Sequence, residues 1–522
     1  MSRNGLTDLE RSVGKLLIGR LSGADLDDDM ADALESGIVS GITLFKENAQ
    51  SVEQLLSLCA SIYRHYEGIP LIAVDQEGGA VQRFDHILTA VPSPMSLAAS
   101  PKFNAVREVV ALSCRQLQLL GINCLLAPTL DIASNPHNPV IGTRSFGSNP
   151  ETVIRFGSLV ATTAARFGLM AVGKHFPGHG ATDEDSHTAL AVNRSDGRLL
   201  WARDLLPFRG CKDLLPAIMV GHIWLPGVDS EAIPATMSSN VITALLREYL
   251  QFDRLVMTDD LFMNAITAKW GVEEAAIRSV AAGAQQLLPL GSPAQVRAVH
   301  AALMAAVTSG RISEQQVADA AAAVERSRAE LSPPCVLDRL EEAAAELKRL
   351  SSADRQLCLE VATSSICVLR GAAPVISEGK WLLLVPEHPR YCLPLPAALG
   401  QAVEKLGLVG KVELLIKRYP LDPTDDECAT IAAEAGQNNC LFLTFRTLNN
   451  PGQSRLGAAL AQSDKERVTV ACDVPYDLIG LAAWDNCLAT FDPSDLSMEA
   501  LANVLTGSNQ AQGICPVSLT AR

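Results

Sequence analysis

The sequence predicts an α/β protein of two domains, an N-terminal (β/α)8 barrel of the TIM type followed by a smaller α/β three-layer sandwich. Short apolar runs alternate with longer helical patterns over roughly the first 330 residues. Polar residues recur where these runs end, and a second, smaller series of alternating segments follows residue 355. A chain of 522 residues is long enough for two such domains.

Seven apolar runs in the first part have the continuous hydrophobicity of parallel strands that are buried on both faces. They are 37–45, 70–76, 122–132, 169–176, 216–224, 254–261 and 281–290. A further strand near 235–238 would complete the eight that a closed barrel needs. Helices are expected between the strands, over 51–66, 103–120, 151–167 and 240–250. Polar residues at the ends of many strands favour a barrel over an open sheet: Asp75, Asp131, Lys174, His222 and Asp259.

The barrel domain is expected to end near residue 335. A helix that begins at Ser313, with a capping-box partner at Gln316, should stop before the prolines at 333 and 334. We therefore assign 1–335 to the catalytic barrel, 336–355 to a linker that contains a solvated helix over 341–350, and 356–522 to the C-terminal domain. Its expected strands are 381–387, 411–417, 439–445, 467–473 and 487–492.

Composition narrows the function classes. A net charge of −15 and a pI near 5.1 argue against nucleic acid or an anionic membrane as the main partner. The N-terminal segment lacks a continuous apolar core, so we expect no signal peptide, and no run of about 18 apolar residues predicts a membrane span. The 13 cysteines are scattered without a C-x-x-C pair, which is typical of reduced thiols in a cytoplasmic protein.

The strongest functional signal is the segment KHFPGHGATDEDSH at 174–187. Its glycines and proline exclude a regular helix or strand, and it gathers lysine, histidine and acidic residues directly after the apolar run 169–173. Barrel enzymes carry their chemistry in such loops, so the sequence predicts an enzyme. The histidines do not have helical metal-ligand spacing and no cysteine lies among them, so we expect no metal there.

Three other segments contribute polar residues, and each also has a simple structural interpretation. In VMTDDLFM (256–263), Asp259 could be a helix N-cap. In DQEGGAVQRF (75–84), Asp75 and the glycines could form a tight turn, and in NPVIGTRSFG (138–147), Arg144 could be an exposed loop residue.

Together, in this order, the four segments resemble glycoside hydrolase family 3, in particular its β-N-acetylglucosaminidase (β-N-acetylhexosaminidase) branch. The resemblance covers the barrel, and 351–371 and 504–519 look like the start and end of the family's C-terminal sandwich domain. It implies that Asp259 is the nucleophile of a retaining mechanism and that His187, assisted by Asp185, is the general acid/base. It also implies that Lys174 and His175 bind sugar hydroxyls and that Asp75, Arg83 and Arg144 bind the non-reducing-end sugar.

The chemistry of Asp185 and His187 fits the acid/base role, and a purely structural role is the alternative. In extended backbone, residues at i and i+2 point the same way, so the carboxylate of Asp185 is expected to reach the imidazole of His187. The plain alternative is a hydrogen bond that only orders the loop. We expect His179 to brace the loop and His222 to form part of the pocket wall. The motif Gly-Ala-Gln at 283–285 departs from the family's usual Gly-Ala-Asp.

The resemblance implies an exo-acting β-N-acetylglucosaminidase that needs no cofactor and whose partner is a small carbohydrate, with peptidoglycan recycling as its context. It would release terminal β-linked N-acetylglucosamine from cell-wall fragments or chitooligosaccharides. Alternatives are a family 3 β-glucosidase, which would lack the Asp185–His187 pair, and a phosphorylase, because a histidine acid/base repels phosphate less than a carboxylate does. A sugar-binding sensor is the non-enzymatic alternative. The sequence gives no indication of the oligomeric state.

Overall fold

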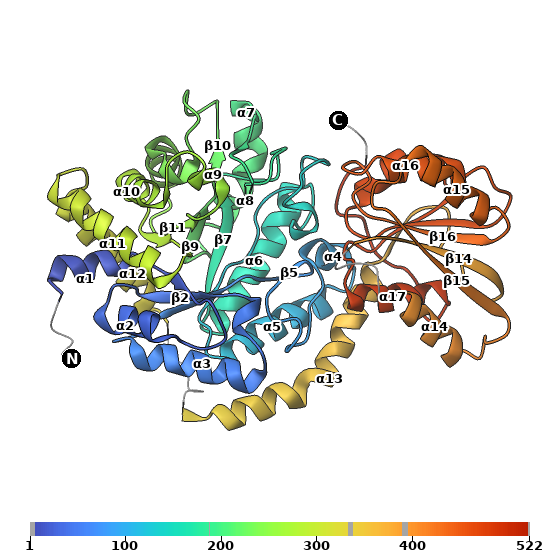
Figure 1. Ribbon diagram of the computed structural model, residues 1–522, viewed down its shortest axis with the longest axis horizontal. Helices are drawn as coiled ribbons and strands as arrows, with labels where there is room; N and C mark the ends of the chain where they lie inside the picture. Colours follow the sequence, from blue (N-terminus) through green and yellow to red (C-terminus); the bar gives the residue numbers. More distant parts are fainter. Residues whose placement is uncertain (1–5, 187, 332–337, 389–394, 520–522) are drawn as a thin grey trace.

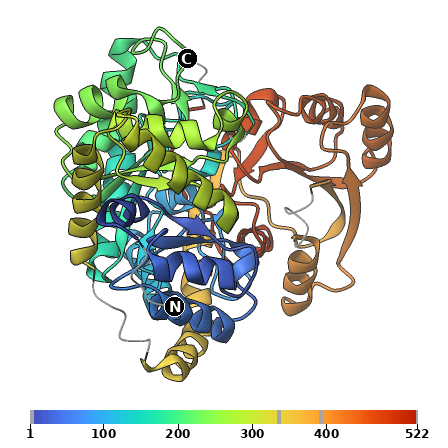
Figure 2. The same cartoon turned by 60° about the vertical axis from the view of Figure 1, so that its left-hand side comes forward.

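The computed structural model describes residues 6–186, 188–331, 338–388 and 395–519. One eight-stranded sheet builds the N-terminal domain and one six-stranded sheet builds the C-terminal domain (Figure 1). The two domains lie side by side, with the second domain against one flank of the barrel (Figure 2). This arrangement confirms the predicted fold class.

The eight-stranded sheet is parallel throughout and closes into a barrel. A parallel bridge that pairs Leu17 with Leu287 joins its two ends. The N–H of Leu287 donates to the carbonyl oxygen of Leu16 over 2.7 Å, and the N–H of Ile18 donates to that of Leu287 over 3.0 Å. The strands, in spatial order, are β1 (Gly19–Arg20), β2 (Gly41–Leu44), β3 (Leu71–Val74), β6 (Cys124–Leu125), β7 (Met170–Phe176), β9 (Ala217–Val220), β11 (Leu255–Asp260) and β12 (Gln286–Leu288).

The eighth strand is not where the sequence predicted it. The prediction of a strand near 235–238 is wrong, because Ala235–Met237 forms a short 3-10 helix. The missing strand is β1, at the start of the chain. It has only two residues and closely follows helix α1 (Asp8–Lys15), which begins with a capping box between Thr7 and Glu10. Because the helix and the strand are so close in the sequence, their apolar residues form one continuous run. Leu16, Leu17 and Ile18 are nevertheless fully buried.

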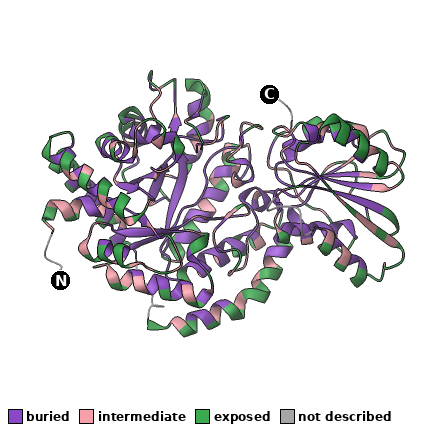
Figure 3. Ribbon diagram, in the orientation of Figure 1, coloured by how far each residue is buried: buried purple, intermediate pink, exposed green. Residues whose placement is uncertain are grey.

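Helices surround the barrel, and their outer faces are exposed while the strands are buried (Figure 3). The predicted helices are confirmed, and Ser313 caps α12 with Gln316 as expected. Helix α12 covers the amino-terminal end of the barrel, since Val324 packs with Ile18 and Leu71 in the barrel interior. The surrounding helices are α2 (Asp28–Ser36), α3 (Val52–His65), α5 (Phe103–Leu119), α6 (Pro150–Arg166), α8 (Leu206–Cys211), the helical segment Asn240–Tyr249, α10 (Val272–Ala282), α11 (Pro293–Thr308) and α12 (Glu314–Ala329).

Small elements follow the carboxyl ends of the barrel strands, where the functional loops lie. A hairpin of β4 (Gln76–Gly78) and β5 (Val81–Gln82) directly follows β3. A parallel pair of β8 (Ala191–Val192) and β10 (Ile223–Trp224) joins the loops after β7 and β9. Three short helices complete this face: α4 (Pro94–Ala99), α7 (Gly197–Leu199) and α9 (Asn264–Thr267).

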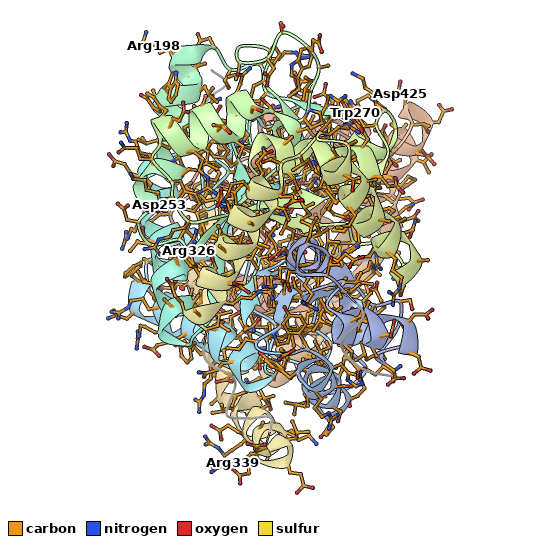
Figure 4. All side chains as sticks on the ribbon, turned by 90° about the vertical axis from the view of Figure 1, so that its left-hand side faces the viewer. Arg198, Asp253, Trp270, Arg326, Arg339 and Asp425 are labelled. Carbon is orange, nitrogen blue, oxygen red and sulfur yellow. The ribbon has the colours of Figure 1, made fainter. Side chains whose placement is uncertain are left out.

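One long helix, α13 (Leu340–Ser365), connects the two domains (Figure 1). It packs against α3, α4 and α5 of the barrel and against α17 of the second domain. Its first residues project from the barrel, where the side chain of Arg339 is 68% exposed (Figure 4). The segment 336–355 that we expected to be a linker thus falls mostly within this helix, and the domain boundary stays a prediction.

The C-terminal domain is a six-stranded sheet between two layers of helices. In spatial order its strands are β13 (Cys367–Arg370), β18 (Asn486–Ala489), β17 (Arg467–Ala471), β16 (Asn439–Thr444), β14 (Gly379–Pro386) and β15 (Val412–Tyr419). All neighbours pair in parallel except β13 with β18, and β13 was not predicted. Helices α15 (Asp425–Ala435) and α16 (Gly452–Leu460) pack together on one side, and α14 (Leu395–Lys405) and α17 (Asp495–Leu505) on the other (Figure 1).

Among the helices of the described ranges, none combines the length and the apolar character that a membrane span requires.

Candidate active site

A cavity of about 400 Å³ opens at the carboxyl ends of the barrel strands. This is the end of a barrel at which enzymes of this fold carry their active sites. Its walls include residues that the sequence predicted for the site: Asp75, Arg83, Arg144, Lys174, His175 and Asp259. Asp185 is not among the lining residues, and His187 lies outside the described residues.

Lys174 lies at the centre of a charged network in the floor of the cavity. It belongs to strand β7, and its side chain is only 2% exposed. Its Nζ lies 2.6 Å from Oδ1 of Asp75 and 2.7 Å from Oε1 of Glu77. Arg83 completes one side, since its Nη2 donates to Oδ2 of Asp75 over 2.9 Å.

Glu77 is a site residue that the sequence analysis missed. Both of its carboxylate oxygens accept hydrogen bonds from Arg144, at 2.9 Å from Nε and 2.8 Å from Nη2. Its side chain is 1% exposed. The spacing of the two acidic residues could have indicated it, because Asp75 and Glu77 are at i and i+2 at the end of a strand and therefore face the same side.

The network keeps its charges in spite of burial. Burial alone would raise the pKa of Glu77, but the nearby Arg144 and Lys174 outweigh it and lower that pKa to about 2. The pKa of Asp75 falls well below its usual range because Lys174 and Arg83 overcome the same burial effect. Burial lowers the pKa of Lys174, yet its two carboxylate partners raise it overall. The site therefore holds paired, charged hydrogen-bonding groups at neutral pH.

Asp131 orders the loop that follows strand β7. Its carboxylate accepts hydrogen bonds from the backbone N–H of His175 and from that of His179, at 3.2 Å and 2.5 Å. It also accepts one from Nδ1 of His175 at 2.7 Å. With Nδ1 donating, Nε2 of His175 is free to accept from Nη2 of Arg144, which lies 3.3 Å away. Asp131 was noted as a strand-end residue, but the sequence assigned it no role.

His179 braces the loop, as predicted. Its ring nitrogens lie 2.8 Å from Oγ1 of Thr182 and 2.9 Å from Oγ of Ser186. Burial lowers its pKa to about 4, so the imidazole is neutral at physiological pH. Ser186 itself lines the cavity, which shows that the loop reaches the site.

His222 does not line the cavity, so its expected place in the pocket wall is wrong. It follows strand β9 and is fully buried, and its ring nitrogens contact Oγ1 of Thr236, at 2.9 Å, and the carbonyl oxygen of Asp260, at 2.8 Å. It therefore supports the backbone at the end of β11.

The backbone around Asp185 is a turn and not the extended segment we expected. The N–H groups of Thr188 and Ala189 both lie 2.9 Å from the carbonyl oxygen of Asp185. Because His187 lies outside the described residues, the predicted approach of the Asp185 carboxylate to His187 stays a prediction. The roles of Asp185 and His187 stay predictions.

Asp259 and Asp260 end strand β11 and both line the cavity. Oδ1 of Asp260 accepts hydrogen bonds from the backbone N–H of Phe262 at 2.9 Å and of Leu290 at 3.3 Å. Burial raises its pKa to about 6. Asp260 thus fastens β11 to the segment after β12, whereas Asp259 is the carboxylate with the predicted chemical role. Among the described residues, no set of three His, Cys, Asp or Glu side chains is arranged to hold a metal ion.

Comparisons with known proteins identify relatives that cover much or all of the chain. Beta-hexosaminidase A of Pseudoalteromonas piscicida is 30% identical over 564 residues, which cover 95% of this chain and 91% of that protein. A beta-hexosaminidase of Alkalilimnicola ehrlichii is 35% identical over 294 residues, 55% of this chain and 83% of that one. A solved glycoside hydrolase family 3 beta-N-acetylglucosaminidase from Paenibacillus sp. str. FPU-7 superimposes with a TM-score of 0.86, at 32% identity and 99% coverage of both chains. The model of the glycosyl hydrolase family 3 N terminal domain matches residues 9–327. The chain therefore belongs to glycosyl hydrolase family 3.

Proposed function

We propose that this protein is a retaining exo-β-N-acetylglucosaminidase that hydrolyses terminal β-linked N-acetylglucosamine. The observation that carries the proposal is the cavity, because Asp259 and the charged network around Lys174 line the same cavity. Similarity to proteins named beta-hexosaminidase and beta-N-acetylglucosaminidase supports the choice of sugar.

The size of the cavity suits one terminal sugar. At about 400 Å³ it is near the lower end of the range for ligand pockets, roughly 300–1,000 Å³. Charged donors and acceptors converge on it from four segments of the chain, which suits a ligand rich in hydroxyl groups. Arg83 lines the cavity with a side chain that is one-third exposed, so its guanidinium can donate to a sugar hydroxyl.

The proposed reaction has two steps. In the first, a carboxylate oxygen of Asp259 attacks the anomeric carbon, the glycosidic bond breaks, and His187 gives a proton to the leaving oxygen. In the second, His187 takes a proton from water, the water oxygen attacks the anomeric carbon, and the ester bond to Asp259 breaks. Two inversions at the same carbon retain its configuration. Asp185 would orient His187.

For the site of action we propose the cytoplasm, with cell-wall fragments or chitooligosaccharides as substrates. Every cysteine in the described ranges is a free thiol, and all but Cys515 are buried. Buried thiols of this kind suit a reducing compartment.

The direct test measures phenol release from the nitrophenyl β-glycosides of N-acetylglucosamine and of glucose. We expect turnover of the N-acetylglucosaminide, a rate that does not change with millimolar phosphate, and free N-acetylglucosamine as product. Preference for the glucoside would favour a β-glucosidase, and the sugar 1-phosphate as main product would favour a phosphorylase. Sugar binding without turnover by the wild-type protein would favour a sensor.

A further inference from the structure

The loop that carries Arg144 into the cavity lies between the barrel and the C-terminal domain. The N–H of Ala133 donates to the carbonyl oxygen of Gly147 over 3.0 Å, so the two ends of the loop lie together. It holds the helical turn Gly142–Arg144 and a second turn at 136–137, and is otherwise irregular. Contacts with the surfaces on either side therefore help to set its conformation. On the barrel side, Glu77 holds the guanidinium of Arg144, and Nδ2 of Asn138 donates to the carbonyl oxygens of His179 and Thr182.

On the other side, two residues of the C-terminal domain form hydrogen bonds with the loop. Nη1 of Arg446 donates to the carbonyl oxygen of Pro139, and Nε of Arg446 lies 2.6 Å from Oδ2 of Asp473. Oδ1 of Asp473 accepts a hydrogen bond from Oγ1 of Thr143 at 3.2 Å. Thr143 directly precedes Arg144. One ion pair of the second domain therefore contacts the loop both within its turn, at Thr143, and before it, at Pro139.

The loop backbone lies directly against this ion pair. Gly142 has a φ of +44°, and a Cβ atom there would be 3.1 Å from Nη2 of Arg446 and 3.3 Å from a methyl group of Val474. The side chain of Asp473 is 3% exposed, so its carboxylate depends on these partners. Two further hydrogen bonds tie the loop ends to the same domain, from Tyr476 Oη to Ala133 and from the N–H of Ser148 to Pro516.

We propose that the C-terminal domain supports the sugar pocket from outside, with Arg446 and Asp473 as positioning residues that hold the Arg144 loop in its binding conformation. Neither residue lines the cavity, so each acts through Arg144. Displacement of a binding group by about 1 Å can cost two orders of magnitude in rate, so a support of this kind matters for turnover. The kinetic part of the test rests on the proposed function.

The test compares Arg446→Ala, Arg446→Lys and Thr143→Val with wild type. Arg455→Ala is the matched control, because Arg455 pairs with Asp425 on the outside of the same domain. Arg446→Ala should raise the KM for the nitrophenyl N-acetylglucosaminide and the Kd for N-acetylglucosamine by about 10- to 100-fold. Arg446→Lys should recover part of the loss. Thr143→Val, which keeps the shape of the buried side chain, should weaken binding by about 3- to 10-fold.

A double substitution separates positioning from general stability. In an Arg144→Ala background, Arg446→Ala should change KM less than twofold, because its effect passes through the missing side chain. An undiminished further loss in that background would overturn the proposal. So would a wild-type KM and Kd in Arg446→Ala.

Hydrogen exchange makes the proposal independent of the sugar. Amides in the peptide 138–147 should exchange at least about 10-fold faster in Arg446→Ala than in wild type or Arg455→Ala. Unchanged exchange would overturn the proposal. Absence of sugar binding and turnover in the wild-type protein would instead contradict the proposed function, while the exchange result would still decide whether the C-terminal domain holds the loop.

Discussion

The backbone N–H of Asp260 donates a hydrogen bond to Oδ1 of Asp259 over 2.8 Å. The two neighbouring carboxylates therefore have different tasks. That of Asp260 accepts backbone N–H groups from Phe262 and Leu290, and so holds the end of β11 in place. That of Asp259 receives one of its hydrogen bonds from its own neighbour, which fixes its orientation in the cavity wall.

We expect a fluorinated mechanism-based sugar to label Asp259 and not Asp260, because Asp260 already binds two backbone groups. Peptide mass mapping of the inactivated enzyme would locate the adduct. Asp259→Asn should lose activity by a factor on the order of 10⁴ or more, as is usual when a nucleophile is removed. A label on Asp260, or complete inactivation with neither residue labelled, would contradict the assignment.

Lys174 should be important for stability as well as for binding, because it lies in strand β7 between the buried carboxylate of Glu77 and the partly buried carboxylate of Asp75. Lys174→Met leaves Asp75 and Glu77 facing each other without their shared cation. Breaking a buried pair typically costs about 3–5 kcal/mol, so the Tm should fall by several degrees. Arg83→Met is the control: the side chain of Arg83 is one-third exposed and pairs with Asp75 at the edge of the network, so this substitution should raise KM with little change in Tm. Equal Tm values for the two variants would refute this view of the network.

His187→Ala should discriminate between leaving groups. General acid–base catalysis is worth about 10²–10⁴-fold, and it matters most when the leaving group is a sugar alkoxide. The variant should therefore lose far more activity on a disaccharide than on an aryl glycoside with an acidic phenol. With the aryl substrate, a burst of phenol followed by slow turnover is expected, because no base activates the water that releases Asp259. Rapid-mixing measurements of phenol release would record the burst.

Asp185→Asn should show a weaker form of the same behaviour, since the imidazole remains but is less well oriented. If His187→Ala loses both substrates equally, shows no burst and melts several degrees lower, then His187 has a structural role. His179 is a poor substitute as the proton donor because burial keeps it neutral.

Asp477 should make the stability of the protein depend on pH. It is fully buried and accepts hydrogen bonds from the N–H of Thr447 and from Oγ1 of Thr444, both at 2.9 Å. Burial raises its pKa to about 7, so the folded state favours the protonated acid. The stabilisation from this proton is complete below the unfolded pKa, near 4, and is lost as the pH rises through 7.

We therefore expect Asp477→Asn, which stays neutral, to gain Tm relative to wild type as the pH rises from 4 to 8. Each pKa unit corresponds to about 1.4 kcal/mol, so the change in relative stability is on the order of a few kcal/mol. Thermal unfolding at pH 5 and pH 8 would measure it, with the exposed Asp426→Asn as control. A difference in Tm that stays constant with pH would show that Asp477 does not titrate in this range.

The sequence was informative wherever a long apolar run ended in a distinctive motif. Strands such as β3, β7 and β11 were predicted close to their bounds, and the residues that follow them do meet in one cavity. Strand β1 was missed because two residues are too few to show a pattern, and pairing with distant strands makes them a strand.

The missed site residues have a common explanation. Glu77 meets Arg144 across 67 positions, and Asp131 meets His175 across 44. Each became recognisable only through its partner, and no local pattern specifies that partner. The extended geometry assumed around Asp185 failed for the opposite reason, because local backbone hydrogen bonds form a turn that the motif alone does not reveal.

The seam of the barrel has a consequence for how the protein is made. Strand β1 leaves the ribosome early, but its second neighbour, β12, is made much later, and Gln286 of β12 donates to the carbonyl of Lys15 across 271 positions. Until β12 has been made and has paired, one side of β1 is an open edge on which another chain could add a strand. Late closure of this kind slows folding and prolongs the exposure of incomplete intermediates. We therefore expect substitutions on the seam to reduce the yield of folded protein in cells more than they reduce the stability of the finished enzyme.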